Sequence, residues 1–335
     1  MRQRTIDRDF EMDLMEVNLV AHDEQLPVLR NNENAVGMTR QDYIHAATSN
    51  NTRKAYQSDV RHFINWGGLL PASPESIVNY LHHHAAILNS RTLHRRLTAI
   101  KQWHLTQSFD DPTSHPYIRK TLTGIKNTHG KPKNKAPALT LDDLKKIVLT
   151  LSKSVRLIDI RNNALIQLGF FGAFRRSELV AIKWEDVTFS KEGIEIIIPR
   201  SKTDQGGEGQ VCAIPNGNDS VCAVRALKLW QEYSGLSEGY IFCGISKSEN
   251  ILSHAIKSNQ VNLIIKQITH DSDLENAADY SSHSLRRGFA TEAAKHNAPF
   301  QSIKRQGRWR HEGTVLGYIE EGKRFEENAV NIILY

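Results

Sequence analysis

The sequence predicts a mainly α-helical protein of two domains with one small antiparallel sheet. From about residue 37 onward, apolar residues recur at helical spacing over most of the chain. Strand-forming runs are confined to one stretch, between 187 and 214. A basic stretch at 127–138, interrupted by glycine and proline, separates a helical N-terminal domain (37–126) from a C-terminal domain (139–335).

Length and composition agree with this organisation. A chain of 335 residues is long for one domain and comfortable for two. With 39% hydrophobic and 24% charged residues, the composition is that of an ordinary globular protein. The formal net charge of +6 modestly favours an anionic partner such as nucleic acid. The cysteines Cys212, Cys222 and Cys243 fit no zinc motif, so we expect free thiols, no metal and no cofactor.

Residues 1–36 mix acidic and scattered apolar residues and are predicted to be a weakly structured extension. The first residues contain no apolar signal-peptide core, and no run approaches membrane-spanning length. We therefore expect a cytoplasmic protein with no membrane partner.

The N-terminal domain is predicted to be a set of short helices. Start signals occur at Thr39, Thr52, Ser73 and Ser90, and a last helix begins near Pro116. The apolar stripes are Tyr56, Val60, Phe63 and Ile64; Ile77, Tyr80 and Leu81; Leu93, Leu97 and Ile100; and Tyr117, Ile118, Leu122 and Ile125. The run 82–84 is three histidines; consecutive helical residues point in different directions, so a metal site is not predicted.

The basic stretch between the domains permits two interpretations. Its lysines are Lys126, Lys131, Lys133 and Lys135, with no acidic residue between the first and the last. Such a stretch is typical of a solvated loop or of a strap that lies along phosphates. Its position between two domains favours the strap.

The C-terminal domain should start with a capped helix at Thr140, followed by a helix over about 158–171 and another that begins near Arg175. Strands are predicted at 187–189, 194–198 and 210–214, with a glycine-rich loop at 204–209 closing a hairpin. Helices are expected from Val221 to the end.

Six side chains in this domain together suit one reaction. They are Arg175, Lys202, His283, Arg286, Trp309 and Tyr318. Phosphodiester exchange gathers charge on two non-bridging oxygens, which guanidinium groups match with planar, permanently charged donors. A phenol can attack if the site helps it ionise, and a lysine can protonate the leaving oxygen. Because a covalent intermediate conserves the phosphodiester energy, the reaction needs no ATP.

Taken singly, each of these residues has an ordinary explanation, such as a surface arginine, a solvated lysine on a strand edge or a core aromatic. Their order and local sequences decide otherwise. Gly172-Ala173-Phe174-Arg175-Arg176-Ser177-Glu178-Leu179 and His283-Ser284-Leu285-Arg286-Arg287 resemble the two signature boxes of the tyrosine recombinase (phage integrase) family. Trp309 precedes Tyr318 by nine positions, which is also the family's spacing to its nucleophile.

The resemblance implies a role for each residue. It assigns Arg175 and Arg286 to the scissile phosphate, Lys202 to general acid catalysis and Tyr318 to nucleophilic attack. His283 would transfer a proton or donate a hydrogen bond, and Glu178 would support the site. Most of the family has histidine where this chain has Trp309, and a Cre-like branch has tryptophan; indole is a donor only and cannot shuttle a proton.

The same resemblance implies an architecture and partners. The expected fold is a C-shaped DNA clamp, made of a helical core-binding domain and a catalytic domain, in which the helix over 90–103 enters the major groove. The expected DNA-binding residues are Arg91, Arg95, Arg96, Lys101, Lys131, Lys133 and Lys135. Four protomers would assemble double-stranded DNA with paired sites, form a 3′-phosphotyrosine and exchange strands through a Holliday junction, in integration, excision or resolution. A directionality or accessory protein is a further possible partner.

Other functions remain as alternatives. A type IB topoisomerase shares this chemistry but works as a monomer on one duplex. A DNA-binding protein without catalysis would keep the basic surfaces alone.

The C-terminus is the last feature that the sequence singles out. Phe325, Ala329, Ile332 and Ile333 share one face of a predicted helix. It resembles the family's terminal helix, which docks into a neighbouring protomer. The alternative is that it folds back onto its own domain.

Overall fold

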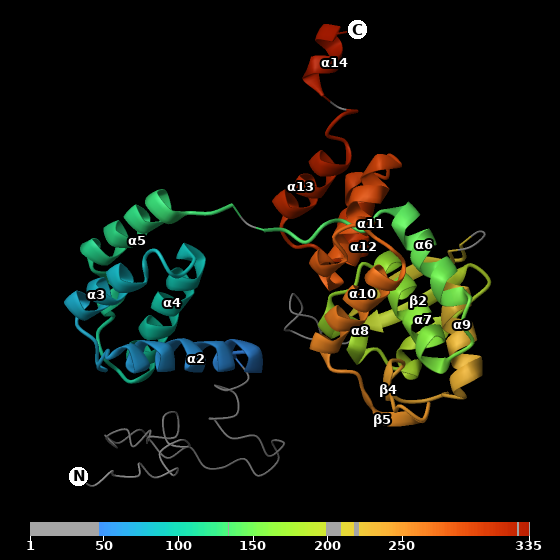
Figure 1. Ribbon diagram of the computed structural model, residues 1–335, viewed down its shortest axis with the longest axis horizontal. Coiled ribbons are helices and arrows are strands. Elements are labelled where there is room, and N and C mark those ends of the chain that lie inside the picture. The colour runs from blue at the N-terminus through green and yellow to red at the C-terminus, as the bar shows by residue number, and fades with distance from the viewer. Residues whose placement is uncertain (1–46, 133, 199–208, 218–220, 327, 335) are drawn as a thin grey trace, which may run out of the picture. The chain divides into compact units, whose positions relative to one another are not determined.

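The computed structural model describes residues 47–132, 134–198, 209–217, 221–326 and 328–334 (Figure 1). The predicted extension 1–36, the start signal at Thr39, Lys133 and Lys202 lie outside the described residues. The chain divides into two compact units, Met1–Pro132 and Lys133–Tyr335. This division falls within the basic stretch 127–138.

Helices make up the described part of the N-terminal unit. They are α2 (Asn50–Trp66), α3 (Pro74–His84), α4 (Ser90–Thr106), the short 3-10 helix η2 (Pro112–Ser114) and α5 (Pro116–His129). The predicted starts at Ser73 and Pro116 are confirmed. The prediction that Thr52 caps a helix is wrong, because Ser49 is the N-cap and its hydroxyl accepts a hydrogen bond from the Thr52 N–H at 3.3 Å. Either residue can act as a cap, and the sequence alone does not set the first turn.

The predicted apolar stripes form the core of this unit. Its buried members are Phe63, Ala72, Ile77, Tyr80, Leu81, Leu93, Leu97, Ile100, Ile118 and Ile125. Tyr117 was expected among them but is 68% exposed, since it lies in the first turn of α5 away from the packed face. The same helix continues to His129, so Lys126 and the first residues of the expected linker are helical.

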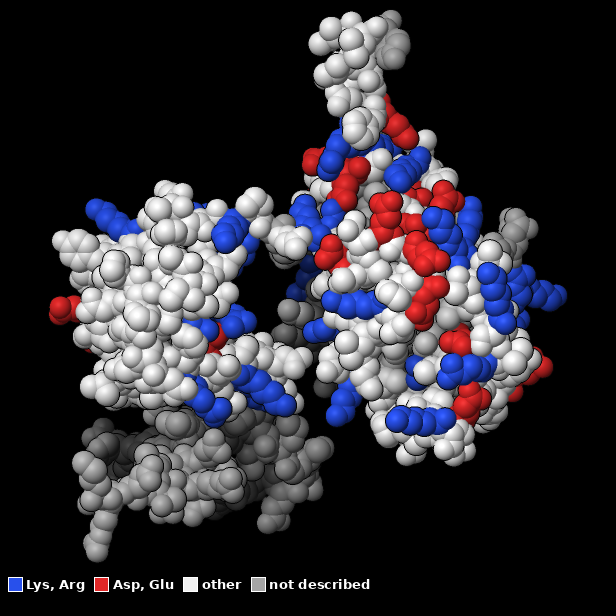
Figure 2. All heavy atoms as spheres, viewed as in Figure 1, with Lys and Arg blue, Asp and Glu red and all other residues white. Residues whose placement is uncertain are grey.

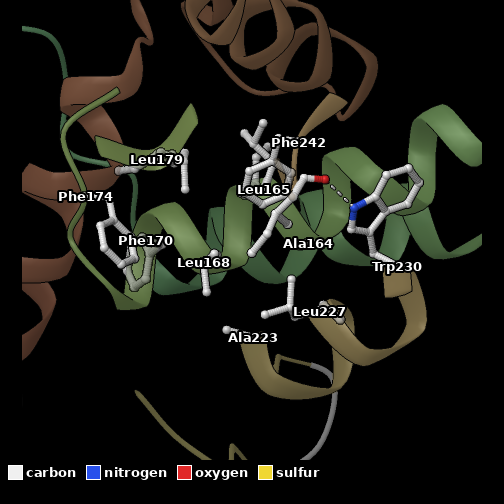
Figure 3. Packing of buried hydrophobic residues seen from close by; sticks show 14 of the residues in the cluster. Ala164, Leu165, Leu168, Phe170, Phe174, Leu179, Ala223, Leu227, Trp230 and Phe242 are labelled. Carbon is white, nitrogen blue, oxygen red and sulfur yellow. Dashed lines mark hydrogen bonds between the residues drawn. The ribbon is translucent and has the colours of Figure 1, made fainter. Parts of the chain in front are cut away.

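The core of the C-terminal unit surrounds one helix. Buried residues occupy almost the whole of α7 (Leu157–Phe171), which packs against α6 (Leu141–Ser152), α9 (Ala223–Ser234) and α11 (Ser282–Lys295). Figure 3 shows Ala164, Leu165 and Leu168 of α7 among side chains from the surrounding elements. The Trp230 indole also donates a hydrogen bond to the Ile241 carbonyl at 2.8 Å. The helix α7 also buries Arg161, Asn163 and Gln167, which hydrogen-bond inside the unit, as buried polar groups must.

The predicted strands form a three-stranded antiparallel sheet in the order β1 (Val187–Phe189), β2 (Gly193–Ile198), β3 (Gln210–Pro215). In the register of this sheet Ile196 lies opposite Val187 on one side and Cys212 on the other. A second antiparallel pair, β4 (Cys243–Ile245) with β5 (Ile251–Ala255), contradicts the expectation of helices alone after Val221. These strands are short and β5 is mostly exposed, so they lack the alternating pattern that predicts strands.

The remaining elements complete the C-terminal unit. They are α8 (Arg176–Ala181), η3 (Trp184–Asp186), α10 (Ser258–Asp271), η4 (Ala277–Asp279), α12 (Phe300–Gly307), α13 (Glu312–Gly322) and α14 (Ala329–Leu334). Both α11 and α12 pack against α13, and none of the residues of α14 is buried. Within the described part of the chain, no helix is long and apolar enough to cross a membrane.

Candidate active site

Arg175 is held at the start of α8 by a tight turn and by Glu178. The turn depends on Gly172, because a Cβ there would lie 2.0 Å from the Phe174 ring. Arg175 is the N-cap of α8, and its backbone N–H donates to Glu178 Oε2 at 3.0 Å. Its guanidinium Nη1 lies 2.5 Å from Glu178 Oε1. An arginine is unfavourable at a helix start, and this buried carboxylate offsets the cost.

Arg286 lies on α11 and is almost completely buried. Its guanidinium donates to two backbone carbonyl oxygens, those of Ala173 and Gly307. Burial, together with the nearby charges of Arg175 and Arg308, lowers the pKa of Arg286 to about 9, although Glu178 and Tyr318 oppose the shift. Such a cation gains from a bound anion, because the anion replaces the hydration that burial removed.

Two aromatic residues join Arg286 to the helix α13. The guanidinium Cζ of Arg286 is 4.3 Å from the centroid of the Trp309 ring. The Trp309 and Tyr318 rings are tilted against each other, with 5.8 Å between their centroids. Gly307 makes this packing possible, since a Cβ there would lie 1.7 Å from the Trp309 ring. Tyr318 is partly buried, at the end of the second turn of α13.

His283 and Lys202 are the two predicted proton-transfer residues. The exposed His283 lies in the first turn of α11, one helical turn before Arg286. Lys202 lies outside the described residues, between the paired strand ends Ile198 of β2 and Gln210 of β3. The strand β3 is attached to the end of α12, because Gln306, the residue before Gly307, donates through Nε2 to the Ala213 carbonyl at 3.0 Å.

Sequence reasoning missed Arg308, the third arginine of the cluster. Its guanidinium is buried and pairs with Glu178 at 3.2 Å, where it also lies 4.8 Å from the Phe174 ring centroid. Burial raises the pKa of Glu178, but Arg308 and Arg175 outweigh burial and hold this pKa below its usual value. The only signal in the sequence is that Arg308 lies between Gly307 and Trp309. That position does not distinguish a buried arginine from a surface one.

The structure therefore brings together Arg175, Glu178, Arg286, Trp309 and Tyr318 from segments far apart in the sequence. Two guanidinium groups, those of Arg175 and Arg308, pair with the Glu178 carboxylate, and Arg286 is a third cation nearby, so the cluster carries a positive excess suited to a phosphate. A phenol lies at its edge. Among the described residues no group of histidine, cysteine and acidic side chains is arranged to hold a metal.

The predicted DNA-binding residues lie in varied surroundings. Arg91, Lys131 and Lys135 are exposed. Arg95 is 54% exposed and forms a two-point ion pair with Asp59, while Lys101 lies 3.0 Å from Asp111. Figure 2 shows basic side chains mixed with acidic ones over the visible face of the C-terminal unit.

Arg96 differs most from expectation. It is only 11% exposed, and its guanidinium donates to the Tyr80 hydroxyl at 3.0 Å and contacts the His62 ring. Its Nε lies 3.5 Å from Asp59. The interior of the unit holds this guanidinium, so it is poorly placed to bind phosphate. Helical periodicity put Arg96 off the apolar face, but its guanidinium is buried against Tyr80 and His62.

Comparison with known proteins adds to this geometry. The family model described as "Phage integrase family" matches residues 137–324. The chain is 37% identical over 313 residues to an integrase/recombinase xerD homolog of Selenomonas ruminantium, covering 90% of this chain and 91% of that protein. It is 24% identical to recombinase cre of Escherichia phage P1, over 82% of this chain and 84% of the phage protein.

Solved structures share the fold. A lambda integrase tetramer bound to a Holliday junction matches with a TM-score of 0.60 at 15% identity, covering 85% of this chain and 77% of that chain. XerH site-specific recombinase bound to palindromic difH substrate matches with a TM-score of 0.58 at 19% identity, covering 78% of this chain and 73% of that chain.

Proposed function

The chain belongs to the phage integrase family of tyrosine recombinases, and from this premise we propose how it cleaves and rejoins DNA. It is a site-specific recombinase. The observation that carries the proposed mechanism is the packed series Arg286, Trp309 and Tyr318, in which one indole contacts both the buried cation and the phenol.

In the proposed reaction, Arg175 and Arg286 bind the non-bridging oxygens of the scissile phosphate. The Tyr318 oxygen forms a bond to phosphorus while the bond from phosphorus to the 5′-oxygen breaks. The leaving oxygen takes a proton from Lys202, and the phenolic proton passes to His283 or to solvent, since Trp309 has no acceptor. The product is a 3′-phosphotyrosine and a free 5′-hydroxyl, and attack by a 5′-hydroxyl reverses the step.

We further propose that the recombinase binds double-stranded DNA with paired sites as a homotetramer and passes through a Holliday junction. The support is the fold shared with the lambda integrase tetramer on such a junction. The exposed Arg91 on α4 and the linker lysines Lys131, Lys133 and Lys135 would bind phosphates. We also propose that it acts in the cytoplasm, and that an accessory protein sets the direction of recombination.

The test begins by selecting bound duplexes from a random pool, which supplies a DNA site. Tyr318→Phe should abolish the denaturant-resistant protein–DNA adduct and change binding little, because only one hydroxyl is removed. Tyr280→Phe is the control, since Tyr280 is a buried phenol of another segment, and this variant should still form the adduct. An adduct with Tyr318→Phe refutes the assignment. Strand exchange between two sites distinguishes recombination from relaxation of a single supercoiled duplex.

The C-terminal helix α14 is proposed to dock into a neighbouring protomer. Its apolar side chains are unburied, with Ile332 and Ile333 more than four-fifths exposed. Deleting 324–335 should leave a folded protein that binds one site but does not assemble on paired sites, as native gels would show. The control is Val155→Asp, a change at an equally exposed apolar residue. An insoluble truncated protein, or tetramers that persist, would rule out docking in trans.

A further inference from the structure

Arg308 is a buried arginine that the proposed reaction does not use. It directly precedes Trp309, and only 3% of its side chain is exposed. Its guanidinium donates to protein groups, namely Glu178 and the backbone carbonyls of Gln306 and Gly172. A buried guanidinium is costly unless its donors are satisfied, so the contacts of Arg308 indicate what it does.

The first set of contacts connects Arg308 to Arg175. Glu178 Oε2 accepts from Arg308 Nη2 at 3.2 Å and from the Arg175 backbone N–H at 3.0 Å. The other carboxylate oxygen binds the Arg175 guanidinium. The loop closes through the backbone, because Arg175 Nη2 lies 3.5 Å from the Arg308 carbonyl oxygen. Arg308, Glu178 and Arg175 thus form a ring of interactions.

The second set of contacts connects Arg308 to Arg286. Arg308 Nη2 lies 3.0 Å from the Gly172 carbonyl oxygen and 3.3 Å from that of Ala173. The Ala173 carbonyl is also an acceptor for Arg286. Both arginines that would bind phosphate therefore share a partner with Arg308.

The backbone of Arg308 adds a third observation. It ends α12 in the left-handed region, with φ of 54°. This conformation suits glycine and strains other residues. A strained residue persists only where the surrounding structure holds it. The contacts of the Arg308 side chain with Glu178 and the Gly172 carbonyl hold it here.

We propose that Arg308 is a positioning residue that holds Glu178 against Arg175 and joins Arg175 and Arg286 into one rigid phosphate-binding pair. The part of this inference that names phosphate rests on the proposed function. The part that concerns Glu178 and Arg175 does not.

A consequence can be measured without DNA. The groups that face Glu178 are Arg175 at the start of α8, Arg308 after α12, Arg286 on α11 and the Cys212 thiol on β3. Burial raises the pKa of the Cys212 thiol, so it stays neutral near pH 7. Removing the charge of Arg308 should raise the pKa of Glu178, because burial is then opposed by Arg175 with little other support.

The first experiment follows the carboxyl carbon of Glu178 by NMR in protein labelled with 13C at glutamate, with the signal identified by its loss in Glu178→Gln. Arg308→Gly removes the guanidinium and relieves the backbone strain. It should raise the pKa of Glu178 by at least about one unit. Arg310→Gly, a change at an exposed arginine two residues away, should leave it unchanged. An unchanged pKa in Arg308→Gly overturns the proposal.

The second experiment measures adduct formation on the duplex selected above. Arg308→Lys keeps the charge but loses the planar fork, and it serves if the glycine variant does not fold. Either variant should slow adduct formation roughly tenfold or more while DNA affinity changes less than about threefold. In the Glu178→Gln background the same change should add little, because Arg308 acts through Glu178. Full additivity, or a loss of affinity alone, contradicts the positioning role. If no variant or wild type forms an adduct, the proposed function fails and the NMR result still decides the role of Arg308.

Discussion

The guanidinium of Arg286 lies over the indole ring of Trp309, with 4.3 Å between Cζ and the ring centroid. The face of an aromatic ring attracts a cation, most strongly when both are desolvated. The same indole also contacts the Tyr318 ring. Trp309 therefore sets the distance between a buried cation and a phenol. This relationship explains how tryptophan serves in a site where it cannot transfer protons.

Replacing Trp309 should separate packing from hydrogen bonding. Trp309→Ala leaves a cavity beside Arg286 and should cost roughly 3–5 kcal/mol of unfolding free energy and abolish the adduct. Trp309→Phe keeps an aromatic face and should cost less than about 2 kcal/mol, with adduct formation slowed but detectable. Urea denaturation and adduct gels measure the two effects. If the alanine variant is as stable as wild type, Trp309 does not hold the site together.

Lys202 should be bypassed by a better leaving group. Lys202→Ala should block cleavage of ordinary DNA, because the 5′-oxygen leaves without a proton. A bridging sulfur at that position needs no proton and should restore cleavage. Arg175→Ala is the control and should show no rescue, since its role is charge stabilisation. If sulfur does not restore cleavage by Lys202→Ala, another group is the acid.

Salt dependence should distinguish phosphate-binding residues from structural ones. Replacing Lys131, Lys133 and Lys135 with glutamine should flatten the slope of log affinity against log salt by roughly 2–3. Arg96→Gln should instead lower stability and leave the slope nearly unchanged, because this guanidinium lies inside the unit with Asp59 and Tyr80. An unchanged slope in the lysine variant would exclude the linker from the DNA interface.

Acid should destabilise the N-terminal unit through His84 and His62. Burial and the charge of Arg96 lower the pKa of His62, while Asp59 raises it. Burial also lowers the pKa of His84, as do the charges of His62, His83 and Arg96. The unfolded chain therefore binds more protons, so the stabilisation is present above about pH 6.5 and is lost as pH falls through the folded pKa values.

His84→Phe should reduce this pH dependence. Both ring nitrogens of His84 are buried without a hydrogen-bond partner, and the ring packs against Tyr80 at 4.8 Å between centroids. An apolar ring therefore fits, and the variant should be as stable as wild type at pH 7.5 and more stable at pH 5. Thermal unfolding of the full chain at both pH values measures this. An identical loss of melting temperature on acidification in both proteins would show that His84 is not the sensor.

Local sequence patterns predicted many of the helices. The stripes of Phe63, Leu93 and Ile100 predicted helices because a packed helix must bury one face, whatever it packs against. The caps at Ser73 and Thr140 predicted helix starts for a similar local reason. The sequence did not predict the short strands β4 and β5. Each strand lacks an apolar pattern of its own, and their pairing with each other stabilises them.

The sequence by itself determined the family, the order of the proposed catalytic residues and the nine-position step from Trp309 to Tyr318, since these are properties of the chain. Only the tertiary structure decided which groups each arginine contacts. Arg96 and Arg308 look like surface residues in the sequence, yet Arg96 is enclosed beside Tyr80 and His62, and Arg308 pairs with the buried Glu178. The reason is physical: a buried charge needs hydrogen-bond partners, and these are whichever groups the packing brings near, Tyr80 at 16 positions away in the chain for Arg96 and Glu178 at 130 for Arg308.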